Sequence, residues 1–183
     1  MAATAPQKLD ELDDLTLQRA RRGDARAFRA LVEMYQRRVF ALVGRMLGRG
    51  RASLVEDLAQ ETFLRVFRAL PAFAPEGPAR LSTWILTIAA RLALDELARR
   101  RPVVLAQEPS APPDAEARAL GRAIERAVAA LPPDFRAVFL LREYHDLDYD
   151  EIARALEIDL GTVKSRLSRA RSQLRAALQE VRT

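Results

Sequence analysis

The sequence YDEIARALEIDLGTVKSRLSRARSQL, residues 149–174, decides the fold of the C-terminal part of this chain. Asp148 and the acidic residues after it can cap a short helix, whose inward side chains we expect to be Ile152, Ala153 and Leu156. Residues 157–159 form the turn, and a longer helix begins at about Leu160. This spacing predicts a helix-turn-helix.

The second helix of this pair has one apolar and one polar face. At about 100° per residue, Val163, Leu167, Ala170 and Leu174 share one face, whereas Ser165, Ser168, Arg169 and Ser172 share the other, with Lys164 and Arg175 on the flanks. Residues 160–183 carry 6 basic and 1 acidic side chains. Short hydroxyl groups let a helix approach the major groove and long cations reach bases and phosphates, so we predict a DNA recognition helix. The alternative is a solvated amphipathic helix of a bundle, because basic exposed faces are common.

The composition is that of a globular protein with a basic surplus. The 183 residues are 49% hydrophobic and 30% charged, with a net charge of +5. The absence of cysteine excludes disulfides and thiolate catalysis, and the single histidine, His145, argues against a histidine-rich metal centre. The composition therefore disfavours an enzymatic function. There is no apolar run of about 18 residues and the N-terminus is acidic, so we expect a cytoplasmic protein without membrane insertion.

Helical spacing runs through nearly the whole chain and predicts an all-α fold. Two apolar stripes stand out, one with Phe28, Leu31, Tyr35, Val39, Leu42 and Met46, and one with Leu54, Leu58, Thr62 and Val66. Gly23 is expected to end a short first helix and Asp24 to cap the second. Residues 53–56 have the pattern of a capping box that opens a third helix, and Ser82 or Thr83 is expected to open a fourth.

A proline-rich stretch divides the chain into two domains. Residues 102–115, PVVLAQEPSAPPDA, hold four prolines and no helical stripe, which predicts an extended linker. We assign residues 1–101 to one helical domain and 116–183 to a second, whose last two helices are the helix-turn-helix.

The helix-turn-helix resembles a known family. The sequence GTVKSRLSRARSQL (161–174), preceded by YDEIARALEID, is similar to the fourth region of bacterial extracytoplasmic-function (ECF) sigma factors. In that family this helix enters the major groove at the −35 promoter element, called here the upstream element. The resemblance implies upstream-element contacts from Thr162, Lys164, Ser165, Arg166, Ser168, Arg169 and Arg171. Arg166 and Arg171 lie nearer the packed face, so we expect phosphate contact or pairing within the domain from them. Glu157 stands where the family usually has glycine, and a left-handed backbone there costs about 1–2 kcal/mol.

A second stretch, VEDLAQETFLRVFRAL (55–70), resembles the second region of the same family, which docks on the clamp coiled-coil of the largest polymerase subunit. The resemblance implies docking residues at Asp57, Leu58, Gln60, Glu61, Phe63 and Leu64. The segment also has more apolar side chains than one buried face can hide, which predicts a second contact surface. A central helix that is buried on most sides is the alternative.

The following helix, LSTWILTIAARLALDELARRRP (81–102), resembles the family helix that meets the −10 element, called here the downstream element. In the family, the loop before this helix also takes part, and it corresponds to FAPEGPAR (73–80) here. The resemblance implies that the following residues of the loop and the helix contact the downstream element: Arg80, Ser82, Thr83, Trp84, Arg91, Arg99 and Arg100. A basic surface with a pocket for an unstacked base would hold the melted strand. The alternative role of Trp84 is core packing. The alternative role of residues 99–101 is a favourable interaction with the negative end of the helix dipole. Arg91 replaces the asparagine that is common in the family.

The resemblance implies a sigma factor that binds core RNA polymerase, recognises both promoter elements and helps to open DNA. It also implies that the chain itself is not an enzyme and needs no metal and no cofactor. It also implies an anti-sigma factor as a partner, and we expect a monomer when the chain is free. A stand-alone helix-turn-helix repressor or activator is the first alternative, and it would bind a two-fold operator without polymerase. A helical adaptor or enzyme is the second, and the carboxylate pairs in the sequence have no nucleophile or metal cage near them.

Overall fold

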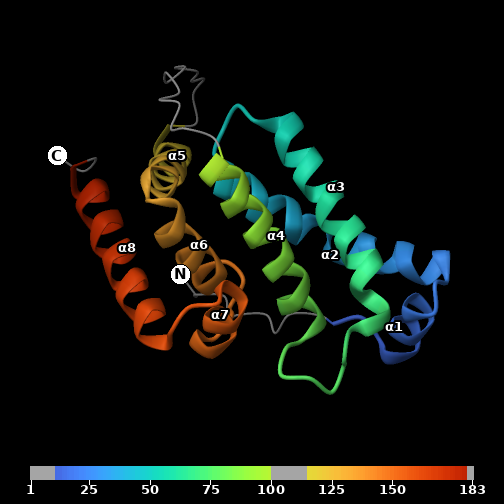
Figure 1. Cartoon of the computed structure of the whole chain (residues 1–183). Helices are drawn as coiled ribbons and strands as arrows, with labels where there is room; N and C mark the ends of the chain where they lie inside the picture. Colours follow the sequence, from blue (N-terminus) through green and yellow to red (C-terminus); the bar gives the residue numbers. More distant parts are fainter. Residues whose placement is uncertain (1–10, 100–114, 181–183) are drawn as a thin grey trace.

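A computed structural model describes residues 11–99 and 115–180, and within these ranges the chain is helical without strands. The all-α prediction is therefore confirmed (Figure 1). The elements are α1 (Asp14–Arg21), α2 (Ala25–Leu47), α3 (Ala52–Ala69), the 3-10 helix η1 (Leu70–Ala72), α4 (Leu81–Arg99), α5 (Ala115–Ala130), α6 (Pro133–Glu143), α7 (Tyr149–Leu156) and α8 (Leu160–Glu180). Nearly all of the predicted linker lies outside the described residues, so the division at 102–115 stays a prediction.

Asp24 and Gly48 set the two ends of α2, and the role of Asp24 confirms the prediction from the sequence. The Asp24 carboxylate accepts hydrogen bonds from the main-chain N–H groups of Arg26 and Ala27, at 2.8 and 2.9 Å, and so caps α2. Gly48 ends α2 with a φ of 81°, a left-handed value that glycine adopts without strain. The buried stripe of α2 consists of Ala27, Leu31, Tyr35, Val39, Leu42, Val43, Met46 and Leu47.

The predicted starts of α3 and α4 are wrong by one or two residues. α3 begins at Ala52 and no side chain caps it, so the expected capping box at 53–56 does not form. α4 begins at Leu81, which places Ser82 and Thr83 inside its first turn. The reason is a distant carboxylate: Glu11 accepts hydrogen bonds from the Ser82 hydroxyl and, at 3.3 Å, from the Ser82 N–H. Glu11 satisfies the helix N-terminus from outside the helix.

The helix-turn-helix forms as predicted, with one shift of the buried face. A capping box of Asp148 and Glu151 opens α7, with the two hydrogen bonds at 2.7 and 2.9 Å. Glu157 ends the helix in the left-handed conformation, at a φ of 54°. Of the residues of α7 that were expected to face inward, Ile152 is buried, whereas Ala153 and Leu156 are only half-buried. Ala155 is the second buried residue of this helix.

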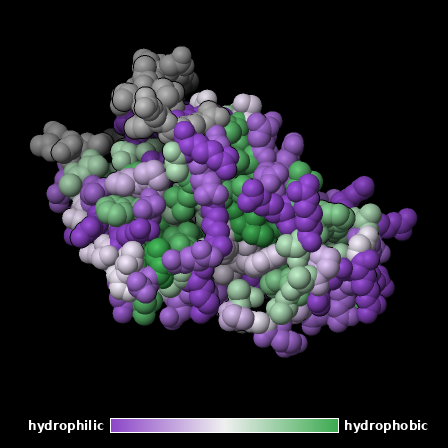
Figure 2. All heavy atoms as spheres, viewed as in Figure 1, coloured by the Kyte–Doolittle hydropathy of each residue, from purple (hydrophilic) through white to green (hydrophobic). Residues whose placement is uncertain are grey.

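The N-terminal helices and the C-terminal helices pack directly against each other. α2 contacts α5 and α6, and α4 contacts α6 and α7, so that α4 lies in the middle of the molecule with α3 and α8 toward opposite sides (Figure 1). One cluster of buried apolar side chains runs through both halves and includes Met46 and Leu86 on one side and Leu140 and Leu141 on the other. On the face shown in Figure 2, the strongly hydrophobic residues gather near the middle. The two halves therefore share a core in this structure.

Candidate nucleic-acid interface

The polar face of α8 is exposed as the sequence predicted. Val163, Leu167, Ala170 and Leu174 are buried against α5, α6 and α7, which turns the opposite face to solvent. That face presents Lys164, Ser165, Ser168, Arg169, Ser172 and Arg175, all exposed. Thr162 is half-buried, and its carbonyl accepts a hydrogen bond from the Ser165 hydroxyl at 3.0 Å. The surface therefore combines short hydroxyl groups with long cations on one helical face.

Two other arginines of α8 pair within the C-terminal half. Arg166 lies 3.1 Å from the carboxylate of Asp134, at the start of α6. Arg171 donates to the Glu143 carboxylate at 2.5 Å through Nη2 and at 3.1 Å through Nε. The hydrogen bond to Glu143 raises the pKa of Arg171 above its ordinary value. These two cations brace α8 on α6, whereas Lys164 and Arg169 extend outward.

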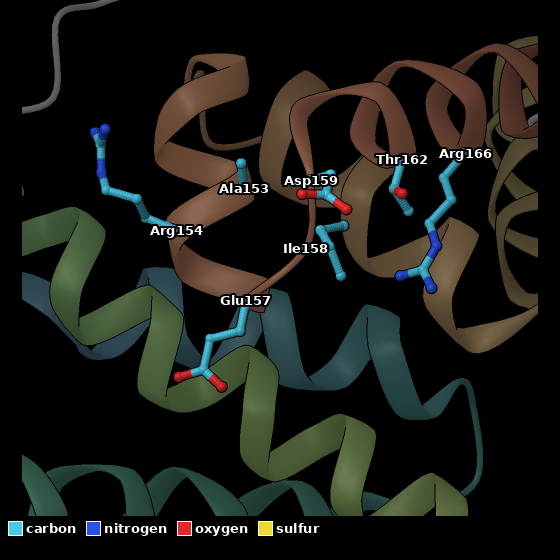
Figure 3. Close-up of a pocket in the computed structure, with 7 residues that line it drawn as sticks. All are labelled: Ala153, Arg154, Glu157, Ile158, Asp159, Thr162 and Arg166. Carbon is cyan, nitrogen blue, oxygen red and sulfur yellow. The ribbon is translucent and has the colours of Figure 1, made fainter.

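Two shallow hollows lie on the surface of the helix-turn-helix. One lies beside the turn itself and is lined by Ala153, Arg154, Glu157, Ile158, Asp159, Thr162 and Arg166 (Figure 3). The other lies between α7 and α8 and is lined by Tyr149, Lys164, Leu167, Ser168, Arg171, Ser172 and Arg175. Three cations in the second hollow, Lys164, Arg171 and Arg175, make it attractive to phosphate groups. Figure 3 shows the Glu157 side chain leaving the first hollow and pointing toward α4.

The residues expected to meet the downstream element are only partly accessible. Ser82 is 0% exposed and Thr83 is 3% exposed. The Trp84 ring is half-buried and lies against Phe73, with 4.9 Å between ring centroids, so its packing role is observed. Arg80 and Arg99 are exposed, and Arg99 lies 3.8 Å from Glu96. Arg100 lies outside the described residues.

Arg91 faces the C-terminal half of the molecule. Its guanidinium lies 2.9 Å from the carboxylate of Glu157. Arg91 and Glu157 are the two positions where the sequence departs from the pattern of the family it resembles, and the structure pairs them with each other. The local sequence around Arg91 or around Glu157 could not predict this contact, because the two residues belong to different halves of the chain.

The predicted docking face of α3 divides into exposed and packed residues. Asp57, Gln60 and Leu64 are exposed, with Leu64 at 50%. Glu61 is half-buried and pairs with Arg65 at 2.7 Å. Leu58 is buried at 9% and Phe63 packs against the core, so these two side chains hold the helix in place.

The docking residues predicted from the sequence did not include Phe67, an exposed aromatic residue of α3. Phe67 is 49% exposed and its ring meets the edge of Phe28 at 5.0 Å. The excess of apolar residues in this helix was the signal that pointed to it. Leu64 and Phe67, three residues apart, therefore form the exposed apolar patch of α3.

Other kinds of site find little support in the described part of the chain. Residues 11–99 and 115–180 contain no group of three or more His, Cys, Asp or Glu side chains placed to hold a metal ion. Across the same residues, no helix is long and apolar enough to cross a membrane. His145 is 4% exposed, and burial, followed by the charges of Arg45 and Arg38, lowers its pKa to about 4. It is therefore a neutral buried side chain near neutral pH.

Comparison with known proteins assigns both halves of the chain. Residues 31–103 match the family model for sigma-70 region 2, and residues 121–174 match that for sigma-70 region 4. The RNA polymerase sigma-H factor of Pseudomonas aeruginosa is 35% identical over 92% of this chain and 95% of its own length. The ECF RNA polymerase sigma-E factor of Escherichia coli K12 is 33% identical, covering 88% of this chain and 92% of its own. CnrH, solved in complex with the cytosolic domain of CnrY, is similar with a TM-score of 0.67 and 26% identity, over 91% of this chain and 96% of its own.

Proposed function

Because the chain belongs to the ECF sigma factors of bacterial RNA polymerase, we propose that its exposed surfaces divide the work of promoter recognition between them. The polar face of α8 reads the upstream element, α4 and the preceding loop meet the downstream element, and α3 docks on the largest polymerase subunit. The chain supplies specificity and the polymerase supplies the chemistry. The alternative of a stand-alone repressor is not favoured by the family matches over both halves.

The observation that carries the proposal is the exposed face of α8. Lys164 and Arg169 extend from this face and have no hydrogen-bond or ion-pair partner among residues 115–180, in contrast to Arg166 and Arg171. Arginine pairs with the guanine edge in the major groove and lysine with guanine or phosphate, so these two are the side chains that we assign to base and backbone contacts. Ser165 and Ser168 keep the helix close enough for such contacts.

The role of α3 rests on its exposed apolar patch. Leu64 and Phe67 are each about half exposed, and a protein gains little from leaving adjacent large apolar side chains in water. Asp57 and Gln60 lie on the same helix and add polar groups at the rim. We assign this combination to the clamp coiled-coil of the polymerase.

An anti-sigma factor is the second partner that we propose. The support is CnrH, a similar protein that was solved with the cytosolic domain of CnrY. A partner of this kind would cover the α3 patch and so prevent docking on the polymerase. Isolation of the chain from its native cells only as a free monomer, while its target genes are silent, would contradict this part of the proposal.

Reconstitution with core RNA polymerase tests the main proposal. The chain is added to core polymerase and a genomic promoter library, and the initiated transcripts are sequenced. We expect initiation from a common pair of promoter elements that core polymerase alone does not use. Binding of the chain alone to a two-fold site with nanomolar affinity, without any effect on initiation, would instead show a repressor or activator.

A further inference from the structure

The C-terminal end of α7 is held by a side chain from the other half of the molecule. Arg91 on α4 donates through Nε to the carbonyl of Ala155 at 2.7 Å and through Nη2 to the carbonyl of Arg154 at 3.2 Å. Its Nη1 lies 2.9 Å from the carboxylate of Glu157. The last carbonyls of a helix lack partners within the helix and carry its negative dipole end. A single guanidinium therefore caps α7 and pairs with its capping residue.

Two more contacts fix α7 along the same helix. The Thr83 hydroxyl donates to Glu151 at 2.9 Å, near the start of α7. Arg154 donates to the carbonyl of Pro78 at 3.3 Å, in the loop before α4. Thr83 and Arg91 are about two helical turns apart, so α7 covers α4 over that distance. α7 meets the loop as well as the helix that we assign to the downstream element.

We propose that this chain blocks itself: α7 occupies the surface of α4 that receives the melted DNA strand, and the free protein cannot bind the downstream element until the halves separate. The inference rests on the role assigned to α4 under the proposed function. The other two surfaces stay open in the closed form, because Leu64 and Phe67 on α3 and Arg169 on α8 are exposed. Polymerase can therefore engage the closed protein before the downstream surface is uncovered.

The closed form is suited to reversible opening. The side chains of Arg91 and Glu157 are 42% and 75% exposed, so water and salt weaken their attraction. The hydrogen bonds of Thr83 and Arg154 also hold the halves together. Further contacts are the hydrogen bond from Arg136 in α6 to the carbonyl of Met46 in α2 and the apolar packing of α6 on α2 and α4. Because α7 also packs against α6 and α8, we expect it to leave α4 only when the C-terminal helices move together.

Glu157→Arg tests the lock without changing a residue assigned to DNA. The new cation faces Arg91 and the repulsion favours the open form. Arg154→Ala is the second variant. It weakens the contact between the halves at another point, by removing the hydrogen bond to the carbonyl of Pro78. Asp150→Arg is the matched control, since Asp150 is an exposed residue of the same helix and the change in charge equals that of Glu157→Arg. The chain has no cysteine, so Arg68→Cys on α3 and Gln173→Cys on α8 accept spin labels at these two sites alone.

Two measurements on the full chain are compared without polymerase. Pulsed electron–electron double resonance gives the distance between the two spin labels. Fluorescence anisotropy gives the affinity for single-stranded DNA that carries the downstream element found in the promoter library. We expect one narrow distance for the wild type and the control. Glu157→Arg should give a longer, broader distribution and bind the oligonucleotide about fivefold more tightly than the control, because apparent affinity scales with the fraction of open protein. Arg154→Ala should change both readouts in the same direction.

The inference is overturned if the wild type already shows a broad open distribution, or if neither variant changes the distance. A longer distance without tighter DNA binding also overturns it, because opening then uncovers nothing. Failure of the proposed function has a different signature, which is the absence of specific initiation when the wild type is combined with core polymerase, whatever the label distance.

Discussion

The guanidinium of Arg136 in α6 donates a hydrogen bond to the carbonyl of Met46, in the last turn of α2 and 90 residues away in sequence. It also donates to the carbonyls of Ala129 and, at 2.8 Å, of Leu131, at the end of α5. Arg136 is 7% exposed, and burial lowers its pKa, with a smaller contribution from the charge of Arg51. One buried cation thus satisfies helix ends from both halves of the chain.

Arg136→Met should therefore lower the free energy of unfolding by roughly 3 kcal/mol, because two buried carbonyls and the half-buried carbonyl of Ala129 lose a charged donor while the apolar stem is kept. Urea denaturation followed by circular dichroism measures the change. Arg126→Met, at an exposed position of α5, is the control and should unfold near the wild-type midpoint. Equal midpoints for the two variants would show that Arg136 contributes nothing to the junction.

Ser82→Ala should lower the stability of the folded protein rather than remove a contact to DNA. The Ser82 hydroxyl and the Tyr35 hydroxyl both donate to Glu11, the latter at 3.0 Å, and burial raises the pKa of Tyr35. Loss of the serine donor should cost about 1–2 kcal/mol of unfolding free energy, as should Tyr35→Phe. Thermal denaturation checks this, with Ser53→Ala on the exposed start of α3 as the control. A promoter defect at full stability would instead make Ser82 a DNA contact.

Arg169→Ala and Lys164→Ala should each weaken use of the upstream element by about tenfold, since a good base contact is worth about 1–3 kcal/mol. Assembly with core polymerase should be unchanged, and native gel electrophoresis of the holoenzyme verifies this. Run-off transcription from promoters with and without the upstream element measures the effect. Arg171→Ala serves as the comparison, because its bond to Glu143 predicts a loss of stability below about 1 kcal/mol and a smaller loss of promoter use. Equal defects for Arg169→Ala and Arg171→Ala would argue against the division between outward and paired cations.

Leu64→Ala and Leu58→Ala should separate docking from folding on the same helix. Leu64 is 50% exposed and Leu58 is 9% exposed. Leu64→Ala should weaken binding to core polymerase with little change in stability, whereas Leu58→Ala should cost about 2–5 kcal/mol by opening a cavity. Surface plasmon resonance on immobilised polymerase and urea denaturation give the two readouts. Undiminished polymerase binding by both Leu64→Ala and Phe67→Ala would remove α3 from the docking surface.

Acidification should destabilise the protein partly through His145. Its pKa falls from 6.5 to about 4 on folding, so the unfolded chain binds the proton more readily. The contribution of neutral His145 is complete above pH 6.5, declines as the pH drops below 6.5 and is lost as it approaches 4, a total of roughly 3 kcal/mol. Denaturation midpoints at a series of pH values should fall less steeply in this window for His145→Phe than for the wild type. Parallel curves would show that the histidine is not buried in its neutral form.

The local sequence was sufficient for the helices and for the helix-turn-helix. The capping box of Asp148 and Glu151 and the stripe from Val163 to Leu174 depend on residues three or four apart, so the pattern predicts both the helix and its buried face. The start of α4 could not be predicted in this way. Its cap is the carboxylate of Glu11, 71 residues before Ser82, and no local pattern reports such a partner.

The same distinction holds for the surfaces. By itself, the sequence determined an all-α chain, the cationic face of α8 and the apolar excess of α3, because helical periodicity sorts side chains by face. Only the tertiary structure decided that Arg166 and Arg171 are paired, that Leu58 is buried while Leu64 is exposed, and that Arg91 meets Glu157. Those outcomes depend on which helix packs on which, and packing joins residues that are far apart in the chain.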